Sequence, residues 1–92
     1  MTDLATEPAQ VIAARVLACA GVAGLSKGPF GTVATHLPGE RLEGVAVYDD
    51  VVEIAIVARA GHPLPALADR VRAAVASLVG GRLINVSIDD LE

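Results

Sequence analysis

Aromatic side chains are almost absent from this sequence. It has no tryptophan, and Tyr48 and Phe30 are the only tyrosine and phenylalanine. A hydrophobic core must therefore be built from Val, Ile, Leu and Ala, within a composition that is 53% hydrophobic. Disordered chains contain few apolar residues, so we expect a folded protein. At 92 residues the chain has room for one domain, and we expect 1–92 to form it, with 1–6 as a flexible tail.

Cysteine is scarce as well. Cys19 is the only one, so no internal disulfide can form, and nothing favours an oxidising compartment. Metal sites usually need three or four ligands at short, characteristic spacings, whereas Cys19, His36 and His62 are scattered along the chain. We therefore expect no metal and no cofactor, and we interpret Cys19 as a small core residue.

Basic residues and long apolar runs are also in short supply. Seven Lys and Arg residues stand against eleven Asp and Glu, which gives a net charge of −4. Proteins bind nucleic acids through clustered Lys and Arg, so we expect no nucleic-acid partner. No uncharged apolar stretch approaches the ~18 residues that span a bilayer, and the N-terminus has no basic segment typical of a signal peptide. We expect a cytoplasmic protein without direct membrane insertion.

Two segments have the periodicity of amphipathic helices. The first begins near Pro8 and ends at Gly21. The second has apolar residues at intervals of three and four between Leu64 and Val79, and it stops before two consecutive glycines. Each helix has one apolar stripe, so each can cover part of a sheet.

The remaining segments alternate with the period of two that is typical of strands. Strands are predicted at 32–37, 42–48 and 51–60, with a last strand near the C-terminus, while 22–25 stays unassigned. The pair Asp49-Asp50 favours a turn, which would join two of these strands as a hairpin. On 51–60 the inward residues are apolar and the outward ones include Glu53 and Arg59, so one face of the sheet should be wet.

The order of these elements is α-β-β-β-α-β. Two helices with one apolar stripe each can cover the same face of a small, mostly antiparallel sheet. We therefore expect the α+β class and a two-layer sandwich.

The sequence contains no convincing set of catalytic residues. The pairs Asp49-Asp50 and Asp89-Asp90 are adjacent in the chain, and neighbouring side chains on an extended backbone point to opposite faces. No serine lies near a histidine and an acid in a recognised nucleophile motif. We expect that the protein is not an enzyme.

The glycine-rich segment 21–31 allows two interpretations. Its last four residues, Gly-Pro-Phe-Gly, match the letters of the GXXG loop with which KH domains clamp nucleic acids. That loop joins two helices, whereas this one precedes a predicted strand and has only Lys27 as a basic neighbour. A connecting turn is the simpler interpretation, and a small nucleic-acid-binding module using Gly28–Gly31 is the alternative. Phe30 is expected to be exposed, as a contact point for a partner.

Three segments resemble the alkaline shock protein family, the cell envelope stress response proteins of Gram-positive bacteria. They are GVAGLS at 21–26, GVAVYDDVVEIAIVARAG at 44–61, and the stretch from PALA at 65–68 to LINVSIDDL at 83–91. Their order and spacing carry the resemblance, which covers nearly the whole chain. The chain is similar to a short, actinobacterial-type member, because it lacks the charged extensions of longer ones and is rich in Ala and Arg, as actinobacterial proteins are.

The resemblance implies a non-catalytic scaffold or adaptor that self-associates and is recruited to the membrane by a membrane-anchored partner. The outward positions of 51–60 mix charged residues, Glu53 and Arg59, with the apolar Ala55 and Val57, so they are less polar than a solvated strand needs. This face, or its edge, is therefore expected to mediate self-association. The predicted partner-binding residues are Lys27, Phe30, Glu53, Val57 and Arg59.

Overall fold

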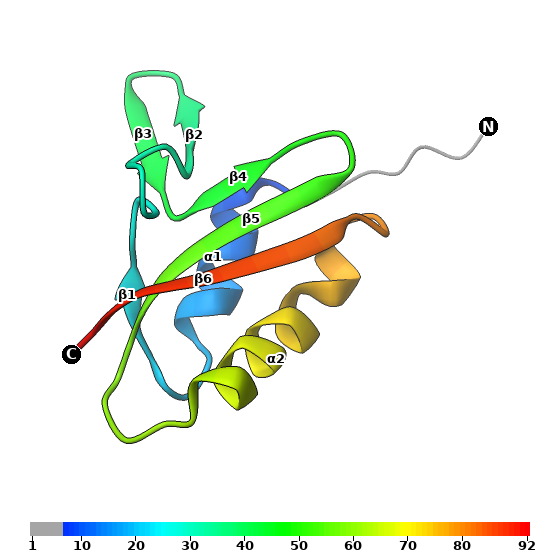
Figure 1. Cartoon of the computed structure of the whole chain (residues 1–92). Coiled ribbons are helices and arrows are strands. Elements are labelled where there is room, and N and C mark those ends of the chain that lie inside the picture. Colours follow the sequence, from blue (N-terminus) through cyan, green and yellow to red (C-terminus); the bar gives the residue numbers. More distant parts are fainter. Residues whose placement is uncertain (1–6) are drawn as a thin grey trace.

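The computed structural model describes residues 7–92 and has the α+β class that the sequence predicts (Figure 1). The predicted flexible tail, 1–6, lies outside the described residues. In chain order the elements are α1 (Ala9–Leu17), β1 (Val22–Leu25), β2 (Ala34–Leu37), β3 (Glu40–Glu43), β4 (Val45–Val47), β5 (Val51–Ala58), α2 (Leu64–Val75), the 3-10 turn η1 (Ala76–Leu78) and β6 (Leu83–Leu91).

Strand β5 is the centre of the main, four-stranded sheet. Strand β6 runs parallel to it along one side, from Leu83 opposite Val51 to Leu91 opposite Ala58. On the other side, β4 and β1 are both antiparallel to β5 and lie end to end, opposite 52–54 and 56–58 respectively. One edge of the sheet is therefore formed by β6 alone, and the other is shared by two short strands.

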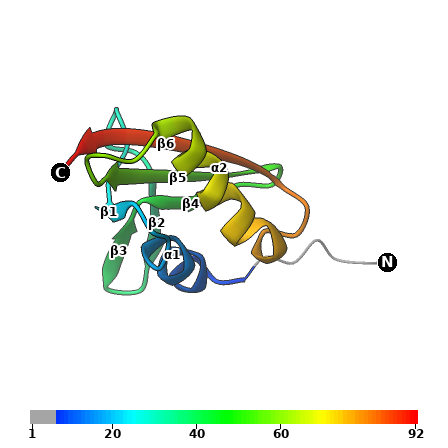
Figure 2. The ribbon, with the colours of Figure 1, turned by 90° about the horizontal axis from the view of Figure 1, so that it is seen from below.

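Both helices pack on the same face of this sheet and make the two-layer sandwich (Figure 2). Parallel strands need a crossover connection, and α2 supplies it between β5 and β6. The predicted apolar stripe of α2 faces the sheet, because the side chains of Leu67, Val71 and Val75 have no exposed surface. They pack with the inward side chains of β5 and with Ile12 and Val16 of α1.

The prediction of one strand over 42–48 is wrong, because the chain turns a corner at Gly44. Its φ of +97° is a conformation that side chains with a Cβ disfavour. Before the corner, β3 pairs with β2 in a separate two-stranded sheet; after it, β4 pairs with β5. The N–H of Gly44 donates to the carbonyl of Val33 (2.8 Å), and its carbonyl accepts from the N–H of Ala55 (2.9 Å).

Two further findings change the predicted element order. Residues 22–25, unassigned from the sequence, form β1 because their backbone pairs with the end of β5. Together with the corner at Gly44, this raises the number of strands to six. The turn at Asp49-Asp50 is confirmed, since β4 and β5 are antiparallel on either side of it.

The face of the sheet away from the helices, which we call the outer face, is less open than predicted. Ala55 lies on it but is fully buried, in a small cluster with Val33 and Ala46. Val33 directly precedes β2 and Ala46 lies on β4, so the cluster lies at the base of the β2–β3 hairpin, which projects from the main sheet (Figure 1). The prediction of a wet face is therefore wrong for the middle of β5.

Candidate functional site

A pocket of about 240 Å³ opens between the loop 26–33 and the outer face of β5 and β6. We call it the outer-face pocket. Its residues come from segments that are far apart in the sequence, and three of its four polar residues lie on the strands. The lining residues are Pro29, Phe30, Thr32, Val33, Glu53, Ile54, Asn85, Val86 and Ser87.

The loop is shaped by its own backbone. The N–H of Gly31 donates to the carbonyl of Gly28 (3.1 Å), and the N–H of Val33 donates to the carbonyl of Lys27 (2.9 Å). Gly28 has a φ of +86°, and a Cβ there would lie only 2.5 Å from Cγ2 of Val33. The interpretation of this segment as a compact turn is therefore confirmed, and the turn holds Phe30 at the pocket.

Two of the predicted partner-binding residues meet in this pocket. Phe30 contributes to its lining although its side chain is 88% exposed. Glu53 lines the same pocket from β5. An aromatic side chain that is left in water beside a concave surface is typical of a protein interface.

Glu53 is the one charged residue that lines the pocket. It is half-buried and lies opposite Asn85 in the parallel register of β5 and β6. Within residues 7–92 its carboxylate has no ion pair, and the one ion pair found there joins Arg72 to Asp69 on α2. The pocket therefore presents a negative charge and neighbouring polar groups, suited to a positively charged or hydrogen-bond-donating group.

The other three predicted residues do not line the pocket. Lys27 is exposed at the start of the loop, and Arg59 is exposed beyond the end of β5, with its N–H bonded to the carbonyl of Gly21. Val57 is half-buried on β5 between Gly24 of β1 and Asp90 of β6. Of the five predicted residues, two thus line the pocket, Lys27 lies at the start of the loop beside it, and Val57 and Arg59 lie at the far end of the central strand.

Seven of the nine lining residues were missed from the sequence, and three of these are polar: Thr32, Asn85 and Ser87. Asn85 and Ser87 alternate with apolar residues, and this pattern indicates only a solvated face. What makes them part of a site is the long-range pairing of β6 with β5. No local pattern in the sequence specifies that register.

Among residues 7–92 there is no group of three or more His, Cys, Asp or Glu side chains that could hold a metal ion. His36 is exposed on β2, whereas His62 precedes α2 near Gly21. No helix within the same residues is long and apolar enough to cross a membrane. The Gly28–Gly31 loop joins β1 to β2 and not two helices, so it lacks the setting of the KH loop.

Comparison with known proteins identified no relative of the chain. No family model, no curated protein and no solved structure matches the chain. The resemblance to the alkaline shock protein family therefore stays a prediction, and the outer-face pocket has to be interpreted from its own residues.

Proposed function

We propose that this chain is a non-catalytic scaffold or adaptor of the envelope stress response type, which self-associates and binds a protein partner at the outer-face pocket. The observation that carries the proposal is that an exposed Phe30 and a half-buried Glu53, which has no ion pair within residues 7–92, line the same small pocket. In this proposal the protein works in the cytoplasm and reaches the membrane only through a membrane-anchored partner.

The size of the pocket favours a side chain over a free small molecule. Sites for drug-sized ligands occupy ~300–1,000 Å³, whereas this pocket has about 240 Å³. Interfaces commonly place one anchoring side chain of a partner in such a recess, with aromatic residues around it.

The charge of the pocket favours a basic side chain of the partner. A Lys or Arg entering it would meet the Glu53 carboxylate and could lie against the ring of Phe30, both of which attract a cation. The net charge of −4 would draw a basic segment towards the protein.

The same charge weakens the case for a nucleic acid. A carboxylate beside the loop repels phosphate groups, and Lys27 lies outside the lining of the pocket. We therefore favour a protein partner over the nucleic-acid-binding alternative.

The proposal is tested with a photo-cross-linking amino acid at position 30, expressed in the native host. We expect a covalent adduct with one protein, and a loss of that adduct when Glu53→Lys is added. The matched control carries the cross-linker at Ala18, which is exposed after α1 on the helix side. An RNA adduct at position 30, or equal adducts at both positions, would contradict the proposal.

A further inference from the structure

The outer edge of β6 is the longest open edge of the main sheet. The strand has nine residues, and within the described part of the chain it pairs only with β5. The opposite edge is divided between β4 and β1, and Oγ1 of Thr35 donates to the carbonyl of Val45 on β4 (2.7 Å). Proteins usually shorten, charge or cover such an edge, because it invites pairing with another strand.

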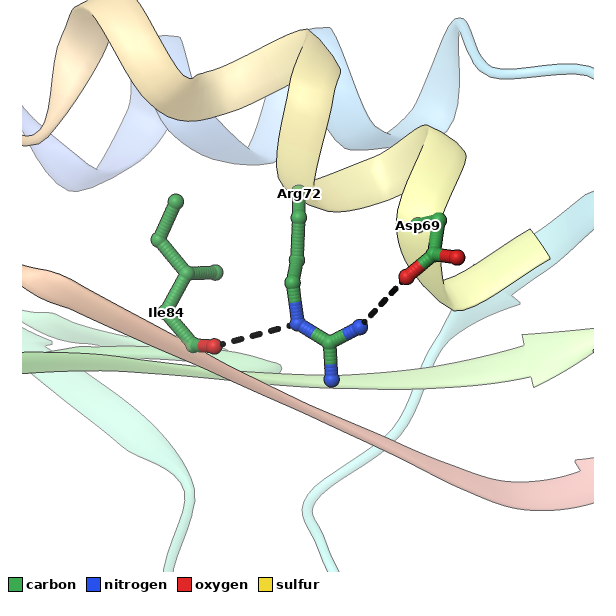
Figure 3. Close-up of polar contacts among 3 residues, drawn as sticks. All are labelled: Asp69, Arg72 and Ile84. Atoms are coloured by element: carbon green, nitrogen blue, oxygen red, sulfur yellow. Dashed lines mark hydrogen bonds and ion pairs between the residues drawn. The ribbon is translucent and has the colours of Figure 1, made fainter. Parts of the chain in front are cut away.

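The hydrogen bonds identify which backbone groups of β6 face this edge. The N–H of Leu83 donates to the carbonyl of Asp50 at the start of β5, and successive residues of a strand face alternate sides. The N–H and C=O groups of Ile84, Val86 and Ile88 therefore point away from β5. In agreement, Nε of Arg72 reaches from α2 to the carbonyl of Ile84 (3.3 Å) (Figure 3).

We propose that this edge pairs with the same edge of a second copy, antiparallel, about a two-fold axis at Val86. The proposal rests on the self-association part of the proposed function and assigns the surface. Around this axis Ile84 lies opposite Ile88 of the second copy, and Val86 lies opposite its own equivalent. These side chains are half-buried against the core of each copy, so pairing extends both cores across the junction.

The charges at the two ends of β6 are complementary in this arrangement. Arg82 and Arg72 lie at the beginning of the strand, where Arg72 is paired with Asp69 and Asp50 adjoins Leu83, and Asp89, Asp90 and Glu92 lie at its end. Antiparallel pairing brings the basic end of each copy beside the acidic end of the other. The opposite charges then attract, and they select the antiparallel orientation.

An unsatisfied atom lies at the acidic end. Oδ2 of Asp89 is buried and has no hydrogen-bond partner within the described residues. About the axis at Val86, Asp89 lies opposite Leu83 of the second copy, between that copy's Arg82 and Ile84. Because Oδ2 is already buried in the single chain, Arg72 of the second copy, which bonds this Ile84, would reach it only if the Asp89 side chain turned outward.

Arg72 also explains why the edge is restrained in a single copy. Its bond to the Ile84 carbonyl is long, its side chain is 44% exposed, and its other contact is the ion pair with Asp69 (Figure 3). In the paired edge, the carbonyl of Ile84 has to accept a hydrogen bond from the N–H of Ile88 in the second copy. Arg72 thus protects the edge of the free chain and releases it when the second strand arrives.

The first test uses Val86→Pro, which removes the one N–H at the axis. This N–H faces away from β5, so the substitution leaves the pairing of β6 with β5 intact. In sedimentation over a wide concentration range, the unmodified chain should convert from monomer to dimer, and Val86→Pro should stay monomeric with unchanged circular dichroism. Phe30→Ala is the control and should dimerise like the unmodified chain.

The second test does not depend on how well the proline variant folds. In a Cys19→Ala background, Val86→Cys should form a disulfide-linked dimer on mild oxidation, whereas Leu83→Cys should not, because its equivalent lies at the far end of the paired strands. A dimer that persists in Val86→Pro, or equal linkage at both positions, would overturn the proposal. A strictly monomeric unmodified chain would also overturn it. Whether the pocket binds a partner is decided separately, by adduct formation at position 30.

Discussion

Two neighbouring residues of β5 show how differently the two faces of the sheet are built. Ile54 and Ala55 have 1% and 0% of their surface exposed, on opposite faces. Ile54 belongs to the large cluster formed with both helices, whereas Ala55 belongs to a small cluster with Val33 and Ala46. The two side chains are thus equally buried, but Ile54 packs in a much larger cluster than Ala55. We therefore expect the helix face to contribute most of the stability, and the thinly covered outer face is where we propose that a partner binds.

The largest effect is expected on the helix face. Ile54→Ala should lower the free energy of unfolding by about 2–5 kcal/mol, because the helices cannot close over the cavity. Urea denaturation followed by circular dichroism measures the loss. The matched control is Val57→Ala on the outer side of the same strand, where the half-buried side chain should cost clearly less. Equal losses would contradict the difference between the faces.

The corner at Gly44 should be the next most sensitive point. A Cβ at this position would lie 2.6 Å from the Cβ of Leu25, in addition to the positive φ. Gly44→Ala should therefore lower the free energy of unfolding by about 2–3 kcal/mol, from left-handed strain and overpacking together.

The control for this corner is Gly39→Ala in the hairpin turn. Gly39 also has a positive φ, but a Cβ there would have no neighbour within 4 Å. This variant should show the backbone strain alone, about 1–2 kcal/mol. If the two variants unfold at the same urea concentration, the close approach to Leu25 contributes nothing to the corner.

The anchoring of the hairpin on the outer face should have a smaller effect. Thr35→Val removes the 2.7 Å hydrogen bond to the carbonyl of Val45 at almost constant volume. The free energy of unfolding should fall by about 0.5–1.5 kcal/mol. Hydrogen exchange should show faster opening of β2 and β3 than of β5, and uniform acceleration would contradict a local anchor.

The smallest effect on stability belongs to Phe30. Its ring is 88% exposed, so Phe30→Ala should change the free energy of unfolding by less than about 0.5 kcal/mol. The same substitution should abolish capture of the partner that a cross-linker at a neighbouring loop position identifies. A large loss of stability would mean that the ring supports the fold and not the interface.

The features predicted correctly depend on local patterns. The stripe of α2 with Leu67, Val71 and Val75, the inward side of β5 and the turn at Asp49-Asp50 follow from spacing and turn propensity. The exposure of Phe30 also follows from its place in a glycine-rich turn.

The features that escaped prediction depend on distant contacts. The alternation of 42–48 continues through Gly44, so nothing local shows that the chain changes sheets there. The burial of Ala55 depends on Val33, and the place of Glu53 beside Asn85 depends on how β6 pairs. For this reason the sequence predicts two residues of the pocket but not the pocket itself.

Val33 belongs both to the wall of the pocket and to the cluster that anchors the β2–β3 hairpin. Its carbonyl also accepts the N–H of Gly44, where the chain leaves the hairpin. The base of the projecting hairpin and a wall of the outer-face pocket therefore share one residue. A molecule that bound the hairpin and moved it would therefore change the affinity of the pocket for its occupant. By reciprocity, an occupant of the pocket would change the affinity of the hairpin for that molecule by the same factor.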